Sequence, residues 1–296
     1  MTDAAFIFAE FFRAHGRFPE IFPPKTIEDF IVRRMLLEHD IAFTYCTDKF
    51  SCARYVAQAI GQEYLPQRFW SGSKISDIPL ASLPRKFIVK TNHGCGQNII
   101  VDKEFDESLR LMKERVPEWL TQNLYLKTRE WQYKNIPPTV LVEELLEEEG
   151  LGAPRDYKIY CIGGDVHAIR VVDGMPKSKR ARIYDKTWKL LPIAWAKRLA
   201  PNNYYVYPQS PIIPAPENLG ELIDVAKELS SPFSFVRVDL YNVAGRIYFG
   251  EMTFTPFNAA WTIQPLSSNR EIAAQLLIAA ANKNKRRELD ALIKRA

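Results

Sequence analysis

Two alternating runs around a short turn, in residues 233–254 (FSFVRVDLYNVAGRIYFGEMTF), constrain the fold more than any other feature of this sequence. Alternation of apolar and polar residues with a period of two is typical of a strand that has one buried face. In the first run this period puts apolar side chains on one face and Arg237, Asp239 and Tyr241 on the other. We therefore expect an antiparallel hairpin that carries charged side chains on one face of a sheet.

The length of the hairpin loop decides whether its two acids lie together. A three-residue loop at 243–245 would place Arg237 opposite Glu251, with Asp239 as the diagonal neighbour of Glu251, roughly 7–8 Å away between backbones. Mg²⁺ is commonly held by one or two carboxylates together with phosphate oxygens, so this arrangement predicts a metal site. The alternative is an Arg237–Glu251 ion pair that only braces the sheet. A two-residue loop would put the acids on opposite faces and exclude the metal site.

A glycine-containing turn follows a lysine in residues 90–96, KTNHGCG. The runs FIV before it and NIIV after it predict two strands, so the turn is neither a Walker A loop nor a GxGxxG loop that opens a helix. Lys90 can offer a point charge to a phosphate, and the turn can offer backbone N–H groups. The turn is thus either a flap over a polyphosphate or an ordinary hairpin connection.

An acidic segment, VEELLEEE at 142–149, is the third candidate. A strand that ends in an acid and runs directly into the next segment can offer backbone groups to adenine, leaving Glu143 for the amino group or the ribose. The alternative is a solvated acidic turn, which describes Glu147–Glu149.

The rest of the chain mixes helices and strands without strict strand–helix–strand alternation, which favours an α+β fold with antiparallel sheets. In the first half of the chain we expect a mostly helical segment 1–45, broken at FPEIFPPK, in which Thr26 caps the second helix, and then a helix from Asp48 or Ser51 to Gly61. A helical segment from Ser108 to Trp131, interrupted near Pro117, is expected next. In the second half we expect a hairpin that turns at Gly163 and Gly164, a helix at 217–229, and one long closing helix from about Asn269.

Composition narrows the function classes. A net charge of +5 over 296 residues does not call for a nucleic-acid partner. Four cysteines without a CxxC pair indicate neither a zinc site nor a disulfide framework, and a reducing cytoplasm fits them best. The N-terminus lacks signal-peptide features, and no apolar run reaches the roughly 18 residues of a membrane helix, so we expect a soluble protein. The basic segments 176–182 and 282–296 are expected to be solvated, with a membrane-surface contact left open.

Taken in order, these motifs resemble the ATP-grasp superfamily, and within it the group similar to the teichuronopeptide biosynthesis protein TupA. The resemblance covers about residues 20–270 and rests on TDKFSCARYVAQAIGQEYLP, LPRKFIVKTNHGCGQNIIV, REWQYKNIPP, VEELL, DYKIYCIGG and FVRVDLYNVAGRIYFGEMTFTP. It implies an α+β ATP-grasp fold in which two subdomains clasp ATP. The implied division is a helical segment (1–45), a lid subdomain with the glycine loop (46–141), and a core subdomain with the metal site and C-terminal helix (142–296).

The resemblance also implies residue roles. Lys49, in a DK pair that opens a helix, and Lys90 match the two family lysines that reach the nucleotide. The family takes its metal ligands from an R-x-D strand and an E-x-N strand, but Thr253 stands where asparagine is usual, and its hydroxyl is still an oxygen donor. The implied nucleotide contacts are Lys49, Lys90, His93, Gly94, Gly96, Glu143, Glu144, Leu145 and Lys158. The implied metal ligands are Asp239, Glu251 and Thr253, and the implied catalytic residues are Arg237, Lys90 and Lys49.

The implied activity is that of an ATP- and Mg²⁺-dependent carboxylate–amine ligase in cell-surface polysaccharide assembly, cytoplasmic or peripheral to the inner face of the membrane. Its partners would be a small-molecule or glycan carboxylate and an amine, with a homo-oligomer left open. The alternatives are a phosphotransferase that acts on a sugar hydroxyl and a non-catalytic glycan-binding or scaffold protein. Secondary candidates are His93 and His167 for proton transfer, Asp156 beside Lys158 for the phosphates, and Arg129, Arg155, Arg180 and Arg182 for an acidic glycan.

Overall fold

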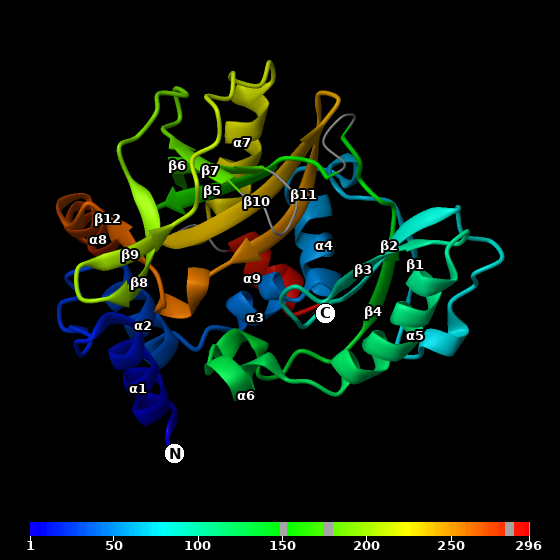
Figure 1. Cartoon of the computed structure of the whole chain (residues 1–296), viewed down its shortest axis with the longest axis horizontal. Helices are drawn as coiled ribbons and strands as arrows, with labels where there is room; N and C mark the ends of the chain where they lie inside the picture. The colour runs from blue at the N-terminus through cyan, green and yellow to red at the C-terminus, as the bar shows by residue number, and fades with distance from the viewer. Residues whose placement is uncertain (149–152, 174–179, 282–286, 296) are drawn as a thin grey trace. The chain divides into compact units, whose positions relative to one another are not determined.

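The computed structural model describes residues 1–148, 153–173, 180–281 and 287–295 (Figure 1). The chain divides into two compact units, one made of Met1–His39 with Glu148–Ala296 and the other of Asp40–Glu147. The N-terminal helices therefore group with the C-terminal half of the chain. The three-part division expected from the sequence stays a prediction.

The unit Asp40–Glu147 is built on a four-stranded antiparallel sheet in the order β1-β4-β2-β3. The strands are β1 (Arg68–Gly72), β2 (Lys86–Thr91), β3 (Asn98–Asp102) and β4 (Val140–Glu143). The helices are α3 (Ile41–Thr47), α4 (Lys49–Ala59), α5 (Asp106–Leu120) and α6 (Leu124–Thr128). Helix α5 packs on β2 and β3, and its Met112 and Val116 join Phe87 and Val89 in a buried cluster. This core holds the strands on either side of the glycine turn.

Two sequence expectations in this unit are refined by the structure. Asp48, and not Ser51, caps α4, because its carboxylate accepts a hydrogen bond from the N–H of Phe50. Helix α5 continues through Pro117 and ends at Leu120, so the interruption follows the proline and does not coincide with it. A proline near a helix end removes a single backbone hydrogen bond, and the turn that follows satisfies the remaining carbonyls.

The other unit contains a five-stranded sheet in the order β11-β10-β5-β6-β7 and a three-stranded sheet in the order β12-β8-β9, both antiparallel throughout. Its strands are β5 (Asp156–Ile162), β6 (Asp165–Asp173), β7 (Arg180–Tyr184), β8 (Ala194–Ala200), β9 (Asn203–Val206), β10 (Phe235–Val243), β11 (Arg246–Thr253) and β12 (Thr262–Gln264). Its helices are α1 (Asp3–His15), α2 (Ile27–Leu37), α7 (Leu219–Ser230), α8 (Leu266–Ala281) and α9 (Arg287–Ile293).

One face of the five-stranded sheet is covered by a helix, and the other is covered in part by a second group of helices. Helix α7 packs against β5, β6 and β10 (Figure 1). At this contact the Cys161 thiol lies 3.8 Å from the carbonyl oxygen of Ala226. On the other face, Tyr160 and Phe235 join a core formed with α1, α2 and α8. This core covers only one end of that face, and charged side chains occupy the rest of it.

The hairpin of β10 and β11 differs from the expected one. Its loop has two residues, Ala244 and Gly245, both with positive φ, since Val243 pairs with Arg246. The expected three-residue loop is therefore wrong. A two-residue loop alone would separate the acids, but β11 contains a β-bulge: Leu240 pairs with Phe249, while Asp239 pairs with Glu251.

Gly250 is the extra residue of this bulge, and the bulge turns Glu251 to the face of the sheet that carries Asp239. A β-carbon at this position would lie 3.0 Å from both the carbonyl oxygen of Asp239 and the ring of Tyr241, so the bulge suits glycine. The resulting register places Asp239 directly opposite Glu251, and Arg237 opposite Thr253. The cross-strand partner of Arg237 is thus Thr253, two residues further along β11 than the expected Glu251.

The other expected elements are found. Thr26 caps α2 and donates its hydroxyl to Asp29, and the hairpin of β5 and β6 turns at Gly163 and Gly164. In the region of the expected long closing helix the structure has α8 and α9, and residues 282–286 between them lie outside the described residues. Residues 176–179 of the other basic segment lie outside them as well. None of the described helices is long and apolar enough to cross a membrane.

Candidate active site

A buried cluster of acids and bases lies on the face of β5, β10 and β11 that the core leaves uncovered. Asp239 is at its centre: Arg237 donates from Nε to Oδ1 at 2.6 Å and from Nη2 to Oδ2 at 2.7 Å. Lys158 donates from Nζ to Oδ2 of Asp239 at 2.5 Å, because Lys158 and Asp239 are direct cross-strand partners. The Asp239 carboxylate is thus held by two cations in fixed geometry.

Glu251 extends this cluster toward solvent. Its Oε1 accepts a hydrogen bond from Arg237 Nη2 at 3.2 Å and one from the Thr253 hydroxyl at 3.4 Å. The side chain of Glu251 is 37% exposed, whereas that of Asp239 is 3% exposed. In this cluster the carboxylate of Asp239 is therefore shielded from solvent, whereas that of Glu251 is accessible to it.

The electrostatics separate the buried Asp239 from Asp156, a partly exposed acid that also contacts Lys158. Burial disfavours ionisation of Asp239, but the charges of Arg237 and Lys158 outweigh it and hold the pKa of this carboxyl below its ordinary value. Burial raises the pKa of Asp156, although Lys158 lies 2.6 Å from its Oδ2 and opposes the shift. Burial also raises the pKa of Tyr241 well above its ordinary value, with nearby Asp156 and Glu251 acting in the same direction. Asp239 therefore supplies the fixed negative charge.

The donor set fits Mg²⁺ only together with oxygens from a bound molecule. Within the parts of the chain that the structure describes, no group of three or more His, Cys, Asp and Glu side chains could hold a metal ion by itself. Asp239, Glu251 and Thr253 nevertheless present neighbouring hard oxygen atoms. Asp156 also has a buried Oδ1 without a hydrogen-bond partner among the described residues. An oxygen-preferring ion that takes its other ligands from phosphate matches these groups.

In the unit Asp40–Glu147, the structure pairs Lys90 with Glu143. The Lys90 ammonium lies 2.5 Å from Oε2 of Glu143, and Arg68 contacts Oε1 of the same carboxylate at 3.2 Å. Glu143 is 4% exposed, so it is a buried acid between two cations and not the unpaired hinge acid that the sequence suggested. Arg68 was missed because it lies 75 residues from Glu143 in sequence.

Lys49 is tied to the glycine turn itself. Its ammonium donates to the carbonyl of Gly94 at 2.7 Å, and its backbone N–H donates to the carbonyl of Asn92 at 3.3 Å. The Asn92 amide nitrogen donates to Asp48 at 2.7 Å and to the carbonyl of Pro137 at 2.9 Å, while its oxygen accepts from the N–H of Thr139 at 2.7 Å. Asn92 therefore fixes the turn to the start of α4, a role that sequence reasoning did not assign.

The remaining turn residues are placed by local constraints. His93 is 3% exposed, its Nε2 lies 3.1 Å from the carbonyl of Trp119, and burial lowers its pKa. Gly96 has a φ of +69°, the left-handed region that favours glycine. At Gly94 a β-carbon would overlap the side chain of Gln97. The backbone conformation of the turn thus favours glycine at position 96, whereas a β-carbon at position 94 would displace only the flexible end of the Gln97 side chain.

The segment after β4 offers backbone groups, as the sequence suggested. The N–H of Glu144 donates to the carbonyl of Gln67 at 2.9 Å, and the Glu144 carboxylate accepts from the N–H of Gln67 at 2.8 Å. Among the described residues, no hydrogen-bond partner is found for the N–H of Leu145. Leu145 is therefore one of the residues here whose N–H could donate to a ligand.

The secondary candidates are dispersed. Arg129 stacks on Tyr125, Arg155 pairs with Glu148, and His167 lies beside an apolar cavity, where burial lowers its pKa. Arg180 is exposed at the start of β7. Arg182 lines a larger cavity, together with Arg170, which sequence reasoning missed. Arg170 stands in a strand that also carries Asp165, His167 and Asp173, and no local pattern distinguishes it from a solvated arginine.

Residues 30–277 match the family model described as TupA-like ATPgrasp, which spans well over half of the chain. No curated protein matches. Among solved structures, D-alanine–D-alanine ligase from Bacillus anthracis is 17% identical with a TM-score of 0.48, covering 86% of this chain and 71% of that one. L-amino acid ligase from Bacillus licheniformis is 14% identical with a TM-score of 0.43, covering 86% and 55%.

Proposed function

Because the chain belongs to the TupA-like ATP-grasp family, we propose that it is an ATP- and Mg²⁺-dependent ligase that joins a carboxylate to an amine. The observation that carries this proposal is the cluster around Asp239. Asp239 faces Glu251 across the hairpin, and Arg237 and Lys158 supply positive charge beside them. Facing acids with adjoining cations are suited to a metal-bound polyphosphate.

The proposed reaction has two steps. An oxygen of the substrate carboxylate forms a bond to the γ-phosphorus while the bond from that phosphorus to the bridging oxygen breaks, giving an acyl phosphate and ADP. The amine nitrogen then forms a bond to the acyl carbon, phosphate leaves, and the nitrogen loses a proton to water. Neither step requires a nucleophile from the protein, so positioning and charge stabilisation are the tasks of its side chains.

The roles in the first cluster follow from charge. Arg237 and Lys158 stabilise negative charge on the transferring phosphoryl group. Asp239 and Glu251, with the Thr253 hydroxyl, would hold Mg²⁺, which when bound neutralises charge on phosphate oxygens. The network of Arg237 and Lys158 keeps Asp239 ionised at neutral pH, the form that binds a cation.

The roles in the unit Asp40–Glu147 follow from its paired lysines. We assign the phosphates to Lys49, Lys90 and the turn that carries His93, Gly94 and Gly96, and adenine to the backbone near Leu145. Glu143 holds Lys90 in position through its 2.5 Å contact and is itself held by Arg68. Lys49 exchanges the Gly94 carbonyl for phosphate oxygen in this proposal.

We place the reaction in the cytoplasm or at the inner face of the membrane, in cell-surface polysaccharide assembly that joins an amino compound to a uronic acid. The four cysteines support a reducing compartment, since all of them are free thiols and three are buried.

The test is phosphate release from Mg·ATP in the presence of panels of acids and amines. The ligase is expected to release phosphate only when a matching acid and amine are both present, with an amide as product. A phosphorylated hydroxyl product would instead assign a phosphotransferase. Absence of nucleotide binding would leave the scaffold function as the remaining account.

A further inference from the structure

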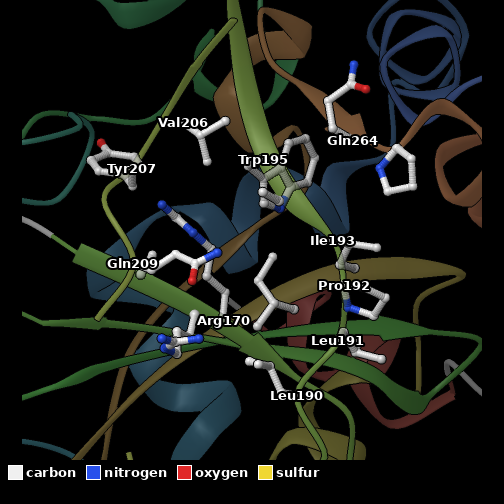
Figure 2. A pocket seen from close by; sticks show the side chains of 15 residues that line it. Arg170, Leu190, Leu191, Pro192, Ile193, Trp195, Val206, Tyr207, Gln209 and Gln264 are labelled. Carbon is white, nitrogen blue, oxygen red and sulfur yellow. The ribbon is translucent and has the colours of Figure 1, made fainter. Parts of the chain in front are cut away.

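A cavity of about 460 Å³ lies within the unit that carries the acid–base cluster. Strands β6, β7 and β8, the segment 190–193 between β7 and β8, the end of β9 with the segment that follows it, and the end of β12 line it (Figure 2). This volume falls in the range of pockets that hold small organic molecules. None of the residues assigned above to ATP or Mg²⁺ lines this cavity, so its role is separate from theirs.

Arg170 gives this cavity its chemical character. The residue is 4% exposed, and its guanidinium lies over the rings of Tyr207 and Phe257, 4.9 and 5.6 Å from their centroids. Among the described residues, no carboxylate pairs with Arg170, and no side chain or carbonyl accepts a hydrogen bond from it. The nitrogen atoms of this guanidinium are open to the cavity, because they are not among the fully buried polar atoms that lack a partner. A ligand that brings a negative charge could therefore pair with them.

The other lining residues support an anionic ligand with an apolar or ring-shaped body. Among the described residues no aspartate or glutamate lines the cavity, whereas Arg182 adds a second guanidinium, half-buried and held through Nε by the carbonyl of Ser210. Trp195 and Tyr207 provide aromatic surface, and Gln209 and Gln264 provide amide groups (Figure 2). Aromatic walls with few polar groups orient a ring and fix its polar substituents.

The register of the sheet connects this cavity to the acid–base cluster. Arg170 pairs with Lys158 across β5 and β6, Lys158 pairs with Asp239, and Asp239 pairs with Glu251. Cross-strand partners share a face, so Arg170 stands in one row with the cluster. At roughly 4.8 Å per strand, two strand spacings separate Arg170 from Asp239, about 10 Å between backbones. A molecule held by Arg170 would therefore lie at the edge of the phosphoryl-transfer site.

We propose that this cavity binds the acid substrate, a carboxylic acid with a ring or hydrocarbon body, and that Arg170 holds its carboxylate. The proposal rests on the proposed ligase function, and it deepens that function by naming the class of acid and the residue that selects it. Arg170 acts as a positioning residue: its guanidinium provides paired donors for a carboxylate and orients the acid toward the neighbouring cluster.

The experiment compares acids with neutral molecules of the same shape. Binding to the full chain is measured by ligand-observed NMR and calorimetry for benzoate against benzyl alcohol and for glucuronate against glucose. At least one acid is expected to bind about tenfold more tightly than its neutral counterpart. Arg170→Met should lose this preference and keep its affinity for Mg·ATP, and Arg170→Lys, which retains the charge, should recover part of it.

A matched control is Lys197→Gln, which removes an exposed charge from β8 outside the cavity and should leave acid binding unchanged. Acid binding that is equal in the native protein and Arg170→Met would overturn the proposal, as would failure of both acids to bind while Mg·ATP binds normally. If the native protein fails to bind Mg·ATP, the ligase function fails, and acid binding that depends on Arg170 would still support the assigned ligand class.

Discussion

Asp239 lies directly opposite Glu251 across β10 and β11, because β11 accommodates Gly250 as a β-bulge between the turn and this pair. If Gly250 were instead paired in a regular ladder, the two-residue loop would place the carboxylates on opposite faces of the sheet. The arrangement of the candidate metal site therefore depends on a glycine that carries no functional group.

Gly250→Ala is expected to lower the free energy of unfolding by about 1–3 kcal/mol, since the added β-carbon would lie 3.0 Å from the Asp239 carbonyl and from the Tyr241 ring. Urea denaturation measures this loss. Gly220→Ala is the control, because its β-carbon meets no atom within 4 Å and alanine favours the helix α7. Equal stability of the Gly250→Ala variant and the native protein would show that the bulge tolerates a side chain.

Asn92→Ala is expected to lower the free energy of unfolding by about 2–4 kcal/mol, because the change removes a hydrogen bond to the buried Asp48 and leaves the Thr139 N–H without its acceptor. The loss should also weaken nucleotide binding, since Asn92 ties the glycine turn to the helix that begins at Lys49. Asn98→Ala, at an exposed position of β3, should leave both the urea midpoint and nucleotide affinity unchanged. A similar effect of both changes would contradict the role assigned to Asn92.

Acid is expected to destabilise the fold through buried histidines. Burial lowers the pKa of His93 below the ordinary 6.5, so between these two values the unfolded chain binds a proton that the folded chain does not. This contribution to the free energy of unfolding is complete above about pH 6.5. As the pH falls below that value, the free energy of unfolding decreases by up to about 1.4 kcal/mol per pH unit. The urea midpoint at pH 7.5 and 5.5 should therefore change less in His93→Gln than in the native protein. An identical change in both would assign the acid sensitivity to other groups.

Much of the acid–base cluster could be predicted from the sequence, because strand periodicity is a local property. The alternation around Arg237 and Asp239 fixes which side chains share a face, whatever the neighbouring strands are. The register between the strands was not predictable in the same way. The expected loop was one residue too long, and the unexpected bulge at Gly250 compensated for it, so the acids came together in a register different from the expected one.

The pairings that the sequence could not supply are those between distant segments. Lys90 contacts Glu143 because β2 and β4 are neighbours in the sheet, and Arg68 reaches the same carboxylate from β1. Strand order is decided by packing of the whole unit, and a single sequence carries little information about it. Arg170 was missed for the same reason, since its lack of an acceptor appears only once its surroundings are known.

The central claim is tested most directly by calorimetry of Mg²⁺-dependent ATP binding to the native protein, Lys90→Ala and Asp239→Asn. Lys86→Ala serves as control for the lysine, because Lys86 is on the same strand and 44% exposed. We predict that the native protein and Lys86→Ala bind, that Lys90→Ala loses at least about tenfold in affinity, and that Asp239→Asn loses the magnesium dependence. Absence of ATP binding by the native protein, or full magnesium dependence in Asp239→Asn, would contradict the account.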